Sequence, residues 1–311
     1  MYKKQFIKDV EIGKKVEDLF SIKYKQPLKQ YKNGFMFSLA LSDKTGEINA
    51  TYWGGDEKYI VQKLYDEFKE GDVIYISGSV GEYKNKLMIS INGHGIIEKS
   101  ERYNVEDFVP KTKNDIGKMV EGINEVISSL NDSNLKTLLE SFFTNSEFVY
   151  KFKNAPAAMY IHHAYLGGLI EHTVNVVELC ETICRLYPQL DRNLTIAGAI
   201  LHDIGKIKEF DVTTNIKVSE EGLLLGHAVI SVNMVLERLK GINDFPDNLK
   251  GKLLHILLSH HGKVEYGSPI EPLFAEAWAV YFADEYDSRL SRSIKTKEDA
   301  KIGPNNFLQK I

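Results

Sequence analysis

The sequence predicts two domains of different fold class, a small all-β barrel followed by an all-α domain. Through most of the first hundred residues, apolar side chains alternate in steps of two, the period of a half-buried strand. From about residue 114 they recur at intervals of three and four, the period of an amphipathic helix. The histidines follow the same division, because eight of the nine lie between residues 162 and 261. We therefore expect the two halves to differ in chemistry as well as in fold.

Length and composition are those of a globular protein. The chain has 311 residues, of which 43% are hydrophobic and 26% charged, enough for two domains of ordinary size. No uninterrupted apolar run approaches the length of a membrane span, and the first residues lack the apolar stretch of a signal peptide. We expect a cytoplasmic protein with no membrane partner.

The first half predicts a five-stranded barrel. Alternating apolar residues and turn signals predict strands near 16–24, 35–42, 47–53, 73–80 and 86–91, with a helix over 57–68 between the third and fourth. This order is typical of the Greek-key barrel of the oligonucleotide-binding (OB) fold. We place this all-β OB domain at residues 1–98.

Charge is distributed unevenly along the chain. The net charge is −4, yet residues 1–100 carry 16 lysines against 14 acidic residues. No acidic residue lies between Leu19 and Ser42, a stretch that holds several lysines. In an OB domain such lysines can follow a phosphate backbone and exposed aromatic rings can stack on bases. The candidate nucleic-acid contacts are Lys25, Lys29, Lys32, Trp53 and Tyr83. For the two aromatic residues, a place in the barrel core is an equally open interpretation.

The second half predicts an all-α domain over residues 114–290. Helices are expected over 116–130, 134–143, 162–186, 192–203, 226–239, 248–261 and 270–290, the first capped by Asn114 or Asp115. Polar residues 99–113 form the linker and the charged residues 291–311 a C-terminal tail. Cys180 and Cys184 are interpreted as reduced core residues.

Seven histidine and aspartate side chains at separate helix positions form a candidate metal centre. A lone histidine in an apolar helix is usually a core residue, but five of them would each be costly to bury unless something drew them together. Imidazole and carboxylate ligands suit manganese, iron, zinc, nickel or magnesium. The candidate ligands are His172, His202, Asp203, His227, His260, His261 and Asp284.

The adjacent pair His202-Asp203 resembles the signature of the HD superfamily of metal-dependent phosphohydrolases. His172 and Asp284 complete the minimal motif of that superfamily, and the three further histidines resemble members that hold two metals. The resemblance implies that Asp203 bridges two divalent cations, with His172, His202 and Asp284 on one and His227, His260 and His261 on the other. Manganese is the first choice by resemblance, and iron, zinc or nickel would also fit.

Two neighbouring residues are candidate catalytic groups beside Asp203. Lys206 follows Gly205, which would allow the chain to turn and bring the ammonium toward substrate phosphate. The alternative is a lysine at a helix C-terminus that interacts with the helix dipole. His162 and His163 precede the first ligand helix. They could reach substrate phosphate or donate a proton, with His163 the stronger candidate, or they could be surface or capping residues.

Over essentially its whole length the chain resembles the YhaM-type 3′-to-5′ exoribonucleases. The resemblance implies metal-dependent release of nucleoside 5′-monophosphates from single-stranded RNA by a metal-activated water, with single-stranded DNA as a second candidate substrate. The stretches that carry it are residues 43–53, 162–172, 201–206, 224–227 and 259–269.

Two other functions stay open. One is an HD phosphohydrolase acting on nucleotides or cyclic nucleotides, and the other is a non-catalytic nucleic-acid-binding protein. Four properties do not follow from the residues alone: the native metal, the preference for RNA or DNA, the direction of digestion and the oligomeric state. A homo-oligomer is one option for the last.

Overall fold

The computed structural model describes residues 3–92, 95–159 and 163–300. Contacts along the chain divide it into two compact units. The barrel unit comprises Met1–Pro110 with Val212–Asn215, and the helical unit comprises Lys111–Asp211 with Ile216–Ile311. Each unit is described by itself.

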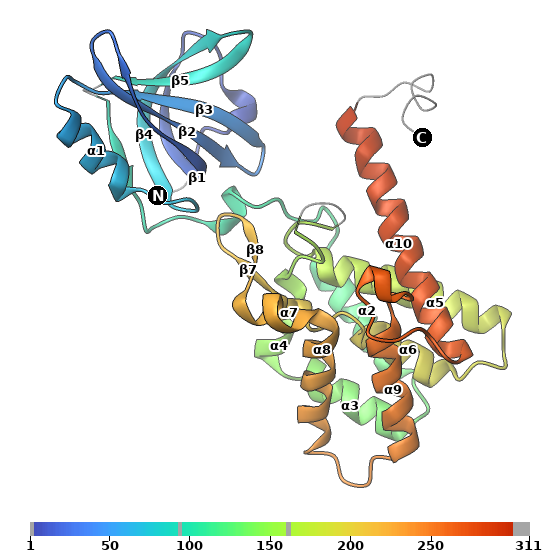
Figure 1. Ribbon diagram of the computed structural model, residues 1–311. Coiled ribbons are helices and arrows are strands. Elements are labelled where there is room, and N and C mark those ends of the chain that lie inside the picture. The colour runs from blue at the N-terminus through green and yellow to red at the C-terminus, as the bar shows by residue number, and fades with distance from the viewer. Residues whose placement is uncertain (1–2, 93–94, 160–162, 301–311) are drawn as a thin grey trace. The chain divides into compact units, whose positions relative to one another are not determined.

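The barrel unit is the expected five-stranded OB barrel, with one further short strand (Figure 1). Hydrogen bonds join the strands in the order β1-β2-β3-β5-β4, and pairing of β1 with β4 closes the ring. The pair β3–β5 is parallel and the others are antiparallel. A sixth strand, β6, was not predicted and extends the sheet beside β4. The elements are η1 (Ile7–Asp9), β1 (Lys15–Tyr31), β2 (Gly34–Asp43), β3 (Gly46–Trp53), α1 (Lys58–Glu67), β4 (Val73–Tyr83), β5 (Lys86–Asn92), β6 (Ile97–Lys99) and η2 (Val105–Asp107).

The predicted alternation of side chains builds the barrel core. Phe37, Leu39 and Leu41 of β2 point inward and are almost fully buried. The turn between β4 and β5 has Lys84 and Asn85 at φ 51° and 59°, the left-handed pair that a two-residue type I′ hairpin requires. This hairpin joins the strands predicted over 73–80 and 86–91.

The helical unit packs its helices around one apolar core. Asp115 is the N-cap of the first helix, where its Oδ1 accepts the main-chain N–H of Gly117 at 2.9 Å. Helix α4 and the strands β7 and β8 were not predicted. The elements are α2 (Ile116–Ser128), α3 (Ser133–Phe143), α4 (Ser146–Asn154), α5 (Gly168–Leu186), α6 (Arg192–Leu201), α7 (Lys206–Glu209), β7 (Phe210–Val212), β8 (Ile216–Val218), α8 (Glu220–Leu239), α9 (Asp247–Ser259), η3 (Val264–Tyr266) and α10 (Ala275–Ala300).

Helices α5 and α10 are among those that differ from their predicted limits. Helix α5 begins at Gly168 rather than near residue 162, because Gly167 before it has a left-handed φ of 79°. Helix α10 runs on to Ala300, past the residue 290 at which we placed the end of the domain.

Helix α8 is the most apolar of the long helices that the structure describes. In the part of the chain that the structure describes, it alone is long and apolar enough, by length and composition, to cross a membrane. Its backbone is broken at Gly226, where φ is 70° and ψ is 153°. Its buried residues other than Gly222, among them Ile230, Ser231 and Val235, lie beyond that break. The break starts a new helical segment at His227, one of the candidate ligands.

Candidate metal centre

All seven predicted ligand side chains converge in the helical unit. His172 lies in α5, and His202 and Asp203 follow the end of α6. The others come from three further helices, with His227 after the break in α8, His260 and His261 after the end of α9, and Asp284 in α10.

Asp203 lies at the middle of this cluster, and its two oxygens face different histidines. Oδ2 lies 3.4 Å from Nε2 of His172 and 3.3 Å from Nε2 of His202. Oδ1 lies 3.5 Å from Nε2 of His227 and 3.5 Å from Nε2 of His260. The carboxylate therefore separates the other ligands into two sets.

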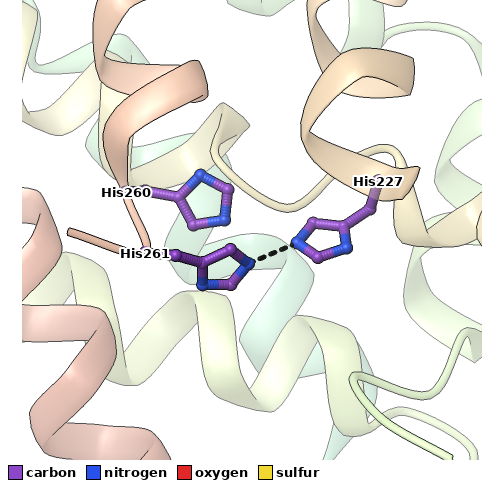
Figure 2. Close-up of side chains that lie close together, drawn as sticks. All are labelled: His227, His260 and His261. Carbon is purple, nitrogen blue, oxygen red and sulfur yellow. Dashed lines mark hydrogen bonds between the residues drawn. The ribbon is translucent and has the colours of Figure 1, made fainter. Parts of the chain in front are cut away.

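The first set consists of His172, His202 and Asp284, and the second of His227, His260 and His261. Within each set, one ligand atom from every residue lies within 4.8 Å of the others. Figure 2 shows the second set, in which Nε2 of His227 lies 2.8 Å from Nε2 of His261. Asp284 also approaches this set, with Oδ2 at 3.6 Å from Nδ1 of His261.

Among the described residues, three buried atoms of the cluster lack hydrogen bonds, and one of them, Asp203 Oδ2, is compensated by the ammonium of Lys206 at 2.6 Å. The other two, Asp203 Oδ1 and His260 Nε2, form none with any residue that the structure describes, although they lie 3.5 Å apart. An unsatisfied buried polar atom is costly, and a bound cation would satisfy both at once. The donor set of imidazole nitrogens and carboxylate oxygens fits a divalent cation.

Burial and charge keep His260, His261 and Asp203 in the forms that bind cations, whereas at His172 the neighbouring carboxylates outweigh burial and raise the pKa well above its usual value. Burial lowers the pKa of His260, and burial together with the charge of His260 lowers the pKa of His261 to about 2. Burial opposes ionisation of Asp203, but the charges of Lys206 and His202 hold its pKa well below the usual range. Neutral imidazole and ionised carboxylate are the ligand forms that a metal requires.

Gly205 is needed for packing rather than for a turn. Its φ is −62°, a value that any residue adopts, so the turning role expected for it is wrong. A Cβ at this position would lie 2.2 Å from the main-chain oxygen of His227. Its N–H also donates to Ser231 Oγ at 2.8 Å. The glycine lets α8 approach the His-Asp pair closely.

Lys206 points into the cluster. Its Nζ lies 2.6 Å from Asp203 Oδ2, and the residue is 6% exposed. Burial lowers the pKa of this lysine, but the charges of Asp203 and Asp284 outweigh it and raise the pKa above the usual value. This contact differs from the helix-dipole alternative, since the ammonium pairs with a ligand carboxylate.

His163 lies outside the cluster, behind His172. It is buried, with Nδ1 at 2.8 Å from the hydroxyl of Tyr165 and Nε2 at 3.0 Å from Asp287 Oδ2. Its Nε2 also lies 3.0 Å from Ser291 Oγ. These contacts favour a structural role over contact with substrate. His162 lies outside the described residues.

Sequence reasoning missed the carboxylates that lie behind two of the ligands. Asp287 contacts His172 and Glu209 contacts His227. For Asp287 a signal existed, since it follows Asp284 by one helical turn and so shares its face of α10. Nothing in the pattern around Glu209 distinguished it.

In the barrel unit, Lys25 is engaged in a structural contact. Its Nζ donates to the main-chain oxygens of Tyr65 at 2.8 Å and Phe68 at 2.6 Å, at the end of α1. It also lies 3.8 Å from the centre of the Tyr65 ring. This ammonium stabilises the C-terminus of the helix, which leaves it poorly placed for phosphate.

The other predicted nucleic-acid contacts lie toward solvent. Lys29 and Lys32 are exposed, and Tyr83 is 63% exposed. Trp53 is half-buried, with its ring edge-to-face against Tyr31 at 5.0 Å. Lys29 and Trp53 pair with Met36 from the two sides of β2, which places them on one face of the sheet.

Comparisons with known proteins agree with this two-part organisation. The family described as HD domain matches residues 169–289, and the family described as OB-fold nucleic acid binding domain matches residues 21–97. Among solved structures, the OB domain of a Thermoplasma acidophilum protein is similar over 32% of this chain and 87% of that one. The two are 18% identical, with a TM-score of 0.26.

Similar proteins cover almost the whole chain. A protein from a Geobacillus species named 3′-5′ exoribonuclease YhaM is 30% identical over 90% of this chain and 83% of its own length. A protein of the same name from Bacillus subtilis is 29% identical over 97% of this chain and 93% of its own length. The chain belongs to the YhaM family of 3′-5′ exoribonucleases.

Proposed function

We propose that the protein is a metal-dependent 3′-to-5′ exoribonuclease that releases nucleoside 5′-monophosphates from single-stranded RNA. The observation that carries the proposal is the position of Asp203, whose two oxygens face two sets of metal-binding side chains. Family membership supports the direction of digestion and the RNA substrate.

The proposed centre holds two divalent cations. The first set, His172, His202 and Asp284, would bind one cation and the second set, His227, His260 and His261, the other. Asp203 would bridge them. Cations held in this way lower the pKa of a bound water and neutralise charge on phosphoryl oxygens. Manganese is the proposed native metal, and the ligand set also accepts iron, zinc and nickel.

The protein's own groups orient and shield this chemistry. His172, His202, Asp203 and His260 are almost fully buried, so bulk water is excluded from the side of the first set. The side chains of His227 and His261 are 16% and 25% exposed, so a substrate phosphate would enter from the second set. Lys206, whose ammonium lies next to Asp203, is proposed to stabilise negative charge on that phosphate.

The barrel is proposed to bind the single strand that the centre digests. Lys29 and Lys32 would follow the backbone, and Trp53 and Tyr83 would stack on bases. Such contacts do not depend on the base sequence. This suits an exonuclease that digests many different RNAs. Single-stranded DNA is a second candidate substrate because these contacts do not involve the 2′-hydroxyl.

The test uses the full chain with Mn²⁺ and a 5′-labelled single-stranded RNA. A ladder of shortening 5′-labelled products with released nucleoside 5′-monophosphates is expected. Cleavage of mononucleotides or cyclic nucleotides alone would support the phosphohydrolase alternative, and a gel shift without cleavage the non-catalytic one. In the Asp203→Asn variant, bound metal and RNA cleavage should be lost together. Full metal-dependent cleavage by this variant would refute the site.

A further inference from the structure

One histidine in each proposed ligand set contacts a carboxylate that is not among the seven proposed ligands. Nδ1 of His172 lies 2.7 Å from Asp287 Oδ2, and Nδ1 of His227 lies 3.0 Å from Glu209 Oε1. We infer that Asp287 and Glu209 are positioning residues, which orient these two histidines so that Nε2 faces Asp203. The inference rests on the proposed metal centre and adds two residues to it.

Two other proposed ligand histidines, His202 and His260, are oriented by main-chain oxygens. Nδ1 of His202 lies 2.7 Å from the oxygen of Ala199, and Nδ1 of His260 lies 2.8 Å from the oxygen of Leu257. Both histidines are at the C-terminal ends of helices, where carbonyl groups have no further main-chain partner. The helix ends therefore supply these acceptors without any side chain.

His172 and His227 lie where a helix offers no such acceptor. His172 is inside α5, where the preceding carbonyls accept main-chain hydrogen bonds of the helix. His227 begins the helical segment after Gly226, and a helix N-terminus presents N–H groups instead of carbonyls. A side chain must therefore provide the acceptor, and a carboxylate does so in both cases.

The acceptor decides which ring nitrogen is available to a metal. When Nδ1–H donates to a carboxylate, the lone pair of a neutral imidazole is on Nε2. The Nε2 atoms of His172 and His227 are the ones that lie 3.4 and 3.5 Å from Asp203. Without the carboxylates, either ring could rotate or adopt the other tautomer.

Each carboxylate forms a second contact. Asp287 Oδ1 accepts a hydrogen bond from Asn175 Nδ2 at 2.8 Å, and its Oδ2 lies 3.0 Å from His163 Nε2. Glu209 Oε1 also accepts the main-chain N–H of His227 at 3.2 Å. A carboxylate held at two points can hold an imidazole in one orientation.

A rival interpretation treats Asp287 as a ligand of a third metal. Ligand atoms of His163, His172 and Asp287 lie within 4.8 Å of one another. However, Nδ1 of His172 cannot both donate to Asp287 and bind a cation, and the separation of 2.7 Å is that of a charge-assisted hydrogen bond. Counting bound metal ions separates the two interpretations.

The experiment measures Mn²⁺ stoichiometry and affinity by calorimetry and elemental analysis on the full chain. Asp287→Ala should lower the affinity for one of the two bound Mn²⁺ ions by about 10–100-fold. Glu209→Ala should lower the affinity for the other ion by about as much. Asp287→Asn and Glu209→Gln keep an acceptor oxygen and should recover most of the affinity. Glu237→Ala is the matched control, because Glu237 pairs only with Lys240 at the surface of α8 in the described structure, and it should leave both affinities unchanged.

The outcomes separate this inference from the proposed function. A wild-type protein that binds no divalent metal would overturn the metal centre and the inference together. If both variants, Asp287→Ala and Glu209→Ala, bind two ions with the same affinities as the wild type, the inference is overturned and the proposed metal centre is not. If the wild type binds three ions and Asp287→Ala loses only the third, Asp287 is a metal ligand and the inference is overturned for this residue. If Asp287→Ala does not fold, NMR of the zinc-loaded wild type tests the inference by detecting which ring nitrogen of His172 carries a proton. Absence of a proton on Nδ1 would overturn the inference.

Discussion

Lys206 and Asp203 form a buried ion pair next to both proposed ligand sets, with Nζ 2.6 Å from Oδ2. Burial by itself would lower the pKa of the lysine and raise that of the aspartate. The opposite charges nearby reverse both effects, so the pKa of Lys206 lies above its usual value and that of Asp203 well below. The pair therefore stays charged, and the lysine neutralises Asp203 when no cation does.

Replacing Lys206 with Met should destabilise the metal-free protein more than the metal-loaded one. Removing one partner of a buried ion pair costs about 3–5 kcal/mol, because the other charge is left uncompensated. A bound cation would compensate Asp203 and reduce that cost. Urea unfolding in EDTA and in Mn²⁺ measures the difference in the free energy of unfolding.

Lys208→Met serves as the control for this prediction. Lys208 is in the same short helix, but its side chain is half exposed and pairs with Glu221 at 3.7 Å. Its replacement should change stability little in either condition. An equal loss of stability for Lys206→Met with and without metal would contradict the prediction.

The cluster of candidate ligands could be predicted from sequence because few residue types bind metals. Histidines and aspartates at apolar helix positions are unusual enough to identify, and all seven converge. Glu209 and Asp287 could not be identified with the same ease, since acidic residues are common on helices. Their role depends on the direction in which a ring on another helix points, and sequence spacing does not give that direction.

In the barrel, too, the sequence predicts the fold better than the contacts of single side chains. Strand order follows from the alternation of apolar residues and from turn signals, so the OB fold was predictable. The role of each lysine was not, because it depends on what lies beside the strand. Lys25 lies next to the end of α1, whereas Lys29 lies four residues further along β1 and faces solvent.

Replacing Lys29 and Lys32 together with Ala should weaken binding of single-stranded RNA. If each lysine neutralises one phosphate, the dependence of log K on log salt should become shallower by about 1.4. Fluorescence anisotropy of a labelled RNA in EDTA, at several NaCl concentrations, measures both effects without digestion. Lys14→Ala is the control, since Lys14 is an exposed barrel lysine paired with Glu11. Unchanged affinity and salt dependence in the double variant would remove these lysines from the RNA site.

Replacing Lys25 with Ala should lower stability rather than RNA affinity. The change removes two hydrogen bonds from a charged donor to carbonyls at the end of α1. Because Lys25 is only half-buried, we expect a loss of about 1–2 kcal/mol in the free energy of unfolding. Calorimetric unfolding of this variant beside Lys29→Ala tests the distinction. Weaker RNA binding with unchanged stability would show that Lys25 contacts the strand after all.

A buried lysine near the N-terminus predicts how stability varies with alkaline pH. Lys3 Nζ donates to the main-chain oxygen of Leu19 at 2.6 Å and lies 3.3 Å from Asp43 Oδ2, with both charged side chains buried. Burial lowers the pKa of Lys3, and the charges of Asp43 and Asp18 only partly oppose this shift. In the unfolded chain the same lysine titrates near its ordinary pKa of about 10.4.

Between these two pKa values the unfolded chain binds more protons than the folded protein does. The free energy of unfolding should therefore rise with pH across this window, relative to a Lys3→Met variant that lacks the titrating group. Urea unfolding of both proteins at a series of pH values from neutral to about 10 measures that difference. Lys8→Met, which removes an exposed lysine, should follow the wild type. The opposite result would be a free energy of unfolding that falls with rising pH in the wild type relative to Lys3→Met. That result would show that the charge of Asp43 outweighs the effect of burial on the pKa of Lys3.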